Sequence, residues 1–240
     1  MTSSLGQDDT NALRQIAQSP CAKALRRAMT ANLSEALSRH GELLRVEGHL
    51  LGSGRVDATS PGGNGDDRQV AAGYLAQTVG SLLRSVVLLI DEEEFYAAAA
   101  LARQLVETEY LLWVFAHEPG EAATWLNTSA DERRAMWQPR HLRSRSQGRF
   151  LAKDYSMHCE LGGHPTPEGM QALINTPDAA AGEVTLVDAL GHAISSWESA
   201  GTFLAAEDTR GDVAAAIARW HEEDPLYAAL AHPPEDSGGG

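Results

Sequence analysis

Residues 95–116, FYAAAALARQLVETEYLLWVFA, place apolar side chains on almost every side of a helix. A helix that is apolar nearly all round is buried in the interior of a protein. Arg103, Glu107 and Glu109 interrupt the apolar residues, so the segment is a poor candidate for a membrane span. We therefore predict that residues 95–116 form the central helix of a helical bundle.

Helical periodicity continues on both sides of this segment, and no stretch alternates convincingly with the period of a β-strand. Further helices are predicted at residues 22–51, 68–90, 121–127, 129–139, 147–161, 185–207 and 212–222. The sequence therefore predicts an all-α protein with a single bundle of about six to eight helices. One stretch, residues 81–90, is also compatible with a strand because Val86 and Val87 are β-branched.

Two segments have no apolar face to bury. Residues 52–67, GSGRVDATSPGGNGDD, predict a long flexible loop because they are rich in Gly, Ser and Asp. Residues 224–240 contain three prolines and end in Ser-Gly-Gly-Gly, which predicts a disordered tail. We expect one domain over residues 1–223 that includes the flexible loop.

The chain is acidic, with 19 Lys and Arg against 33 Asp and Glu and a net charge of −14. This charge argues against a general nucleic-acid or anionic-membrane binder, because its far field repels phosphate. The longest uninterrupted apolar run, residues 86–90, is far shorter than the roughly 18 residues of a membrane span. The two distant cysteines, Cys21 and Cys159, are typical of a reducing compartment. We expect a cytoplasmic protein that does not bind membranes.

Positive charge is concentrated in one basic island, residues 133–153. Residues 131–155 carry seven basic and three acidic side chains, whereas residues 156–240 carry two and fourteen. Together with Trp137, the island could contact phosphates and stack on bases, so RNA or a nucleotide is one candidate partner. The alternative is a solvated face that pairs with acidic regions of the same chain or of a partner protein.

A second group of polar residues is a candidate ligand pocket or a structural polar cluster. Arg103 and Glu107 lie four residues apart on an apolar helix, so we expect them to pair inside the bundle. A later segment, residues 154–165, concentrates titratable side chains before a Gly-Gly turn. The candidate residues are Arg103, Glu107, Tyr155, His158 and His164.

Metal-ligand spacing occurs at Asp188 and His192, which are four residues apart and can chelate an ion. Di-metal bundles use Glu-x-x-His pairs on facing helices, and this sequence contains no Glu-x-x-His. Glu160 and His164 have the same spacing of four, but a Gly-Gly pair lies between them. We therefore expect no metal and no other cofactor.

Two segments resemble a bacterial all-helical family of unknown function. Residues 100–107, ALARQLVE, followed by Leu112-Trp113, resemble that family's Ala-Leu-x-Arg-x-Leu-x-Glu helix. Residues 155–167, which begin with Tyr-Ser and end with His-Pro-Thr-Pro, resemble its later Tyr…Ser…His segment. The resemblance covers about residues 75–175, and the family is distantly similar to the HEPN superfamily (higher eukaryotes and prokaryotes nucleotide-binding domains).

The resemblance implies a dimeric, metal-independent ribonuclease of a bacterial stress or phage-defence system. The superfamily's catalytic signature is an arginine, four to six intervening residues and a histidine, which only Arg134 and His141 match here. Arg134 would stabilise the phosphorane-like charge, and His141 would act as general base or acid on a ribose 2′-OH. Pro139 lies between them, where the superfamily has continuous helix.

Two alternatives stay open. The acidic net charge favours a non-catalytic, antitoxin-like interaction module. The polar residues of the central helix and of residues 154–165 favour a bundle that binds a small molecule in an internal pocket. An exposed cleft that combines Arg134 and His141 would support the ribonuclease, whereas convergent buried polar residues would support the small-molecule pocket.

Overall fold

The computed structural model describes residues 7–50, 65–175, 178–203 and 208–231. Of these residues, 88% are helical and none lies in a β-strand, which confirms the all-α prediction. Residues 81–90, which were also compatible with a strand, belong to helix α3 (Asp67–Asp91). Residues 52–64 and 232–240, which fall in the predicted loop and tail, lie outside the described residues.

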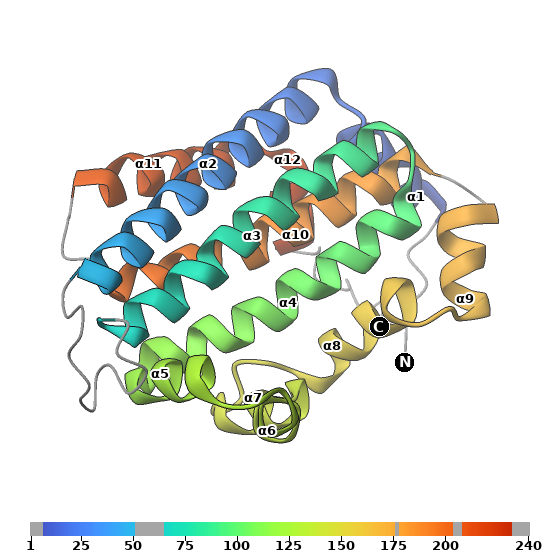
Figure 1. The fold of residues 1–240 in the computed structure, drawn as a ribbon. Coiled ribbons are helices and arrows are strands. Elements are labelled where there is room, and N and C mark those ends of the chain that lie inside the picture. The colour runs from blue at the N-terminus through green and yellow to red at the C-terminus, as the bar shows by residue number, and fades with distance from the viewer. Residues whose placement is uncertain (1–6, 51–64, 176–177, 204–207, 232–240) are drawn as a thin grey trace, which may run out of the picture.

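Four long helices run side by side and form the body of the protein (Figure 1). They are α2 (Pro20–Leu50), α3 (Asp67–Asp91), α4 (Phe95–His117) and α10 (Ala179–Ala200). Helix α3 packs against α2, α4 and α10, and α4 also packs against α10. The predicted central helix is therefore α4, which contributes Leu105, Leu112 and Phe115 to the fully buried core.

The described residues contain twelve α-helices, more than the six to eight that we predicted. The shorter ones are α1 (Gln7–Ala17), α5 (Pro119–Asn127), α6 (Ala130–Met136), α7 (Pro139–Arg145), α8 (Ala152–His158), α9 (Pro167–Met170), α11 (Asp208–Glu223) and α12 (Pro225–Ala231). Five of the twelve begin at a proline. Proline lacks the backbone N–H that a helix interior needs but suits the first helical position, so it divides the chain into more helices than periodicity reveals.

The helix that we predicted at residues 147–161 begins later and ends differently. Helix α8 starts at Ala152 and continues into one π-helical turn, η1 (Cys159–Gly163), instead of stopping at the Gly-Gly pair. Gly162 makes this possible, because a Cβ at that position would collide with the backbone of α4. The π-turn therefore lies directly on α4 and holds α8 beside it.

Part of the predicted disordered tail is an ordered helix. Helix α12 begins directly after Asp224, and both Asp224 and Leu226 are completely buried. The Asp224 carboxylate accepts hydrogen bonds from Arg26 Nη1 at 3.0 Å and Trp220 Nε1 at 2.9 Å. The prediction of disorder is wrong for residues 224–231 because a buried cation on α2 holds this segment in the fold.

That cation, Arg26, is fully buried and joins four parts of the bundle. Its Nε donates to Glu183 of α10 at 2.7 Å, and its Nη2 donates to the Ala17 carbonyl of α1. The neighbouring Arg27 also contacts the Glu183 carboxylate, at 2.8 Å. Buried charges persist only when they are paired and hydrogen-bonded, and this network meets that requirement.

Helices α2 and α3 approach each other closely through small residues. A Cβ added to Gly41 of α2 would lie 2.5 Å from the carbonyl oxygen of Gly73 on α3. Among the described helices, α3 alone is long and apolar enough to cross a membrane by length and composition. Its packing against α2, α4, α5 and α10 accounts for much of this apolar character, and the cytoplasmic location stays a prediction.

Candidate functional site

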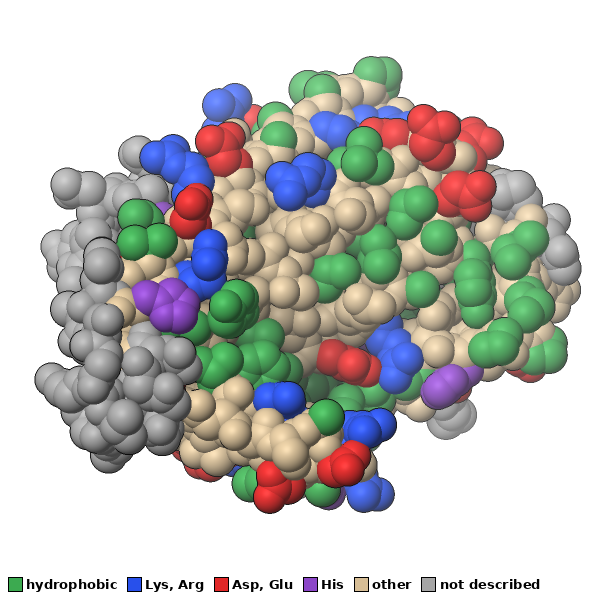
Figure 2. All heavy atoms as spheres, viewed as in Figure 1, with side chains coloured by type: hydrophobic (Ala, Val, Ile, Leu, Met, Phe, Trp, Pro, Cys, Tyr) green, Lys and Arg blue, Asp and Glu red, His purple; other side chains and the backbone are tan. Residues whose placement is uncertain are grey.

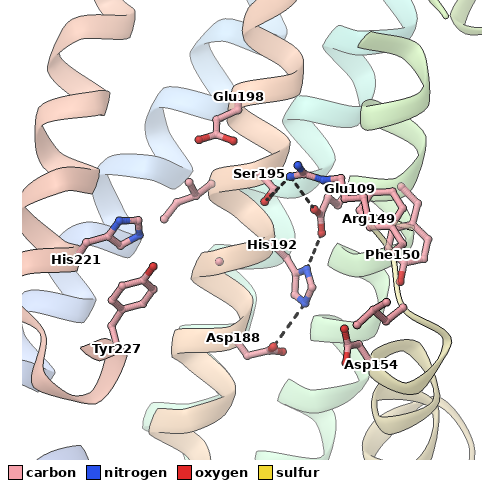
Figure 3. Close-up of a pocket in the computed structure, with 14 residues that line it drawn as sticks. Glu109, Arg149, Phe150, Asp154, Asp188, His192, Ser195, Glu198, His221 and Tyr227 are labelled. Atoms are coloured by element: carbon pink, nitrogen blue, oxygen red, sulfur yellow. Dashed lines mark hydrogen bonds and ion pairs between the residues drawn. The ribbon is translucent and has the colours of Figure 1, made fainter. Parts of the chain in front are cut away.

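A cavity of about 490 Å³ opens beside α10, between the α8 side of the bundle and the α11–α12 pair (Figure 3). The α10 residues that line it are Asp188, Gly191, His192, Ile194, Ser195 and Glu198. The facing residues on the other elements are Glu109, Tyr110, Arg149, Phe150, Leu151, Asp154, His221 and Tyr227. Helices α4, α8, α10, α11 and α12, together with the segment before α8, therefore build one cavity.

His192 lies between two carboxylates at the centre of this cavity (Figure 3). Its Nδ1 donates a hydrogen bond of 2.6 Å to Glu109 Oε2, and its Nε2 lies 3.5 Å from Asp188 Oδ1. The Glu109 side chain is only 6% exposed, although it comes from the apolar helix α4. Arg149 lies above this pair, 4.0 Å from Glu109 and 3.5 Å from Ser195 Oγ.

The two carboxylates determine which histidine is charged. Burial opposes a charge on His192, but the interactions with Asp188 and Glu109 outweigh it and raise the pKa of His192 to about 10. Burial also opposes the charge on Asp188, yet His192 lowers the pKa of Asp188 below its ordinary value. Burial lowers the pKa of the nearby His158, so at neutral pH His158 is uncharged while His192 is charged.

His158, one of the sequence candidates, belongs to this cluster. It is buried at the end of α8, with Nδ1 3.7 Å from Asp188 Oδ2. Its ring lies 5.2 Å from that of His192 in an edge-to-face arrangement. Asp188 therefore lies between two imidazoles from different helices. The sequence singled out His158 but left Glu109 unassigned and set Asp188 and His192 aside.

The other sequence candidates form a second cluster. Arg103 and Glu107 pair at 2.9 Å, and Tyr155 donates to Glu107 at 2.8 Å while it accepts from Arg103 at 3.1 Å. The expected pairing of Arg103 and Glu107 is thus confirmed, but their side chains are 25% and 35% exposed, so the pair lies at the edge of the bundle and not inside it. Helix α4 places these residues on a half-exposed face. His164 is exposed and joins this region through its carbonyl oxygen, which accepts from Tyr96.

Arg134 and His141 lie on two different short helices, separated by the break before Pro139. Arg134 is 76% exposed and pairs with Asp131 at 2.7 Å, whereas His141 Nε2 accepts from Arg140 at 3.2 Å. Each side chain thus has a different partner. No hydrogen bond joins the two side chains within the described residues, and the ribonuclease stays a prediction.

Three of the seven basic side chains in the island pair with carboxylates of the same chain. Arg134 pairs with Asp131, Arg145 with Glu118 and Glu121, and Arg149 with Glu109. Arg133 donates to backbone carbonyls at the end of α5. On the face shown in Figure 2, positively and negatively charged side chains are interspersed. These pairs favour the interpretation of the island as a paired surface over that of a free phosphate-binding surface.

No protein-family model, curated protein or solved structure shows significant similarity to this chain. The resemblance noted in the sequence therefore stays an expectation. The function has to be inferred from the geometry of the site itself.

Proposed function

We propose that this protein binds a small organic molecule in the cavity beside α10. The observation that carries the proposal is the convergence of the buried Glu109 with the partly buried Asp188 and His192 on a cavity of about 490 Å³, which lies within the range of small-molecule sites, roughly 300–1,000 Å³. The hydrogen bond between Glu109 and His192 fixes two of these groups on long, well-packed helices. Rigid placement of this kind is what a binding site requires.

The chemistry of the lining favours a ligand that carries a positive charge. Four carboxylates line the cavity, against one arginine and the charged His192. Of these carboxylates, Asp154 and Glu198 are exposed, and neither takes part in the ion pairs within the described part of the chain, which at the cavity join Glu109 and Asp188 to Arg149 and His192. An organic cation would therefore gain Coulomb energy that an anion would lose.

Aromatic side chains supply a surface for the apolar part of such a ligand. The rings of His221 and Tyr227 stack with centroids 4.1 Å apart and an angle of 8°. Phe150 lies on the opposite side of the cavity (Figure 3). Aromatic faces attract both planar rings and organic cations. The proposed ligand is accordingly a small amine with an aromatic or planar body.

Gly191 allows a direct test of this proposal. It lines the cavity, and no atom lies within 4 Å of the position that its Cβ would occupy. Gly191→Leu should therefore fill the cavity without a backbone clash, and leucine favours the helix more than glycine does. We expect 2-phenylethylamine to bind the wild-type protein by calorimetry or NMR, and Gly191→Leu to abolish that binding while the helical spectrum is kept.

Two controls accompany this experiment. Gly120 of α5 is equally open but lies outside the cavity lining, so Gly120→Leu should leave amine binding unchanged. The uncharged analogue 2-phenylethanol should bind at least tenfold more weakly than the amine. Equal binding of the amine to the wild type and to Gly191→Leu would overturn the assignment of the cavity, and equal binding of the alcohol would overturn the assignment of charge.

A further inference from the structure

Asp188 and His192, which line the cavity, and the adjacent His158 present metal-binding atoms to one another. The ligand atoms of His158, Asp188 and His192 all lie within 4.8 Å of each other. His192 Nε2 lies 3.5 Å from Asp188 Oδ1, and His158 Nδ1 lies 3.7 Å from Asp188 Oδ2. Both distances are longer than the 2.7–3.2 Å of a good hydrogen bond. Hydrogen bonding alone therefore does not explain the arrangement.

Coordination geometry also accounts for these separations. Zinc binds imidazole nitrogen and carboxylate oxygen at about 2.0–2.2 Å, which places neighbouring ligand atoms of a tetrahedral site about 3.4 Å apart. The separations of 3.5 Å and 3.7 Å come within a few tenths of an ångström of this value. Only the two imidazoles would need to approach each other further.

We propose that His158, Asp188 and His192 bind one divalent transition-metal ion, which displaces the Nε2 proton that the charged His192 carries in the absence of metal. Two imidazoles and one carboxylate form the donor set that zinc and ferrous iron prefer, whereas magnesium and calcium prefer oxygen ligands alone. Three protein ligands leave a coordination position open, as in catalytic rather than structural sites. The proposal replaces the expectation, drawn from the sequence, that the protein binds no metal.

Glu109 completes the site as a positioning residue. Its hydrogen bond to His192 Nδ1 holds the proton on that nitrogen, so that Nε2, on the Asp188 side, is the nitrogen that loses its proton to the metal. Such carboxylate–histidine pairs are the usual support of metal-bound histidines. Together, Asp188 and Glu109 also supply two negative charges, which balance a divalent cation in a largely buried position.

This inference deepens the proposed function and rests on it in one respect. Asp188 and His192 line the cavity, so the metal site would border the proposed organic cation, whose charge would then be met by Asp154 and Glu198. Binding of the metal itself does not require that ligand. The two proposals can therefore fail separately, and the experiment uses metal alone as its probe.

The test uses the tag-free full chain after a chelator has removed bound metal. Calorimetry measures a titration with Zn²⁺, and visible absorption measures a titration with Co²⁺. We expect one ion per chain and a Co²⁺ spectrum with nitrogen and oxygen ligands. His158→Ala and Asp188→Asn should each weaken binding at least 100-fold. Glu109→Gln, which removes the charge but keeps the shape, should weaken it about 10–100-fold.

The matched control is His117→Ala, because His117 is an exposed histidine on the same helix as Glu109 and bonds its own backbone at Trp113. It should leave metal affinity unchanged. The Co²⁺ spectrum of the wild type decides the question even if a variant fails to fold. Absence of stoichiometric binding, or binding that Asp188→Asn leaves intact, would overturn the metal site, whereas amine binding would still be judged by Gly191→Leu.

Discussion

Replacing Asp224 with alanine should destabilise this protein more than a typical single substitution. The carboxylate is completely buried and accepts hydrogen bonds from Arg26, from the Trp220 indole and from the Leu226 backbone N–H, at 2.9–3.0 Å. Alanine would leave the Arg26 guanidinium with Glu183 and one backbone carbonyl. Two neutral donors would also lose their acceptor inside the core.

The magnitude follows from these losses. Removal of one partner from a buried ion pair costs about 3–5 kcal/mol, because the remaining charge stays buried. An unsatisfied buried donor costs about 1–3 kcal/mol. The two costs do not add in full, because Arg26 keeps Glu183 and one backbone carbonyl as partners. We expect Asp224→Ala to lower the free energy of unfolding by about 4 kcal/mol, a large part of the roughly 5–15 kcal/mol of an ordinary domain.

Glu107→Ala provides the comparison, because the Arg103–Glu107 pair is partly exposed. Exposed pairs contribute about 0.2–1 kcal/mol, so this variant should shift stability by less than about 1 kcal/mol. Urea unfolding followed by far-UV circular dichroism measures both variants on one scale. Equal shifts for the two variants, or a shift below about 1 kcal/mol for Asp224→Ala, would refute the assignment of the buried network.

Three further outcomes are expected. Gly41→Leu should cost about 1–3 kcal/mol in urea unfolding, because its side chain would meet the α3 backbone, while Gly120→Leu should be neutral. The Asp66 side chain caps α3 by accepting a hydrogen bond from the Arg68 backbone N–H. Burial opposes the charge on Asp66, but the hydrogen bonds from Arg68 outweigh it and lower the pKa of Asp66 below 3.8. Asp66→Ala should thus cost about 1 kcal/mol at neutral pH, and this difference in unfolding free energy should fade as the pH drops below 3.8 through the native pKa. If the chain is a ribonuclease, RNA cleavage should persist in chelator and disappear in His141→Ala, and mass spectrometry of the products should detect 2′,3′-cyclic phosphate ends. Cleavage that survives this substitution would contradict the Arg–His mechanism.

The sequence predicted the fold best where the residues of one helix are enough to show whether that helix is buried. Helix α4 is apolar nearly all round, and this property places it in the core whatever its neighbours are. The sequence predicted least well where the partner is distant. Asp224 lies between a charged stretch and a proline, a composition typical of a tail, but it is held by Arg26, which is 198 residues away. Composition within a short window cannot report such a contact.

The candidate site shows the same limit at the level of chemistry. Asp154 and His158 on α8, and Asp188 and His192 on α10, share one spacing of four residues, which places each pair on one helical face. This Asp-x-x-x-His spacing is visible in the sequence. It differs from the Glu-x-x-His spacing of di-metal bundles, which is the pattern against which the sequence was compared. Periodicity shows which side chains share a face, and not which faces meet. Here α8 approaches α4 because Gly162 lets the π-turn lie against the α4 backbone, and α10 packs on the same helix, so His158 and His192 reach one carboxylate.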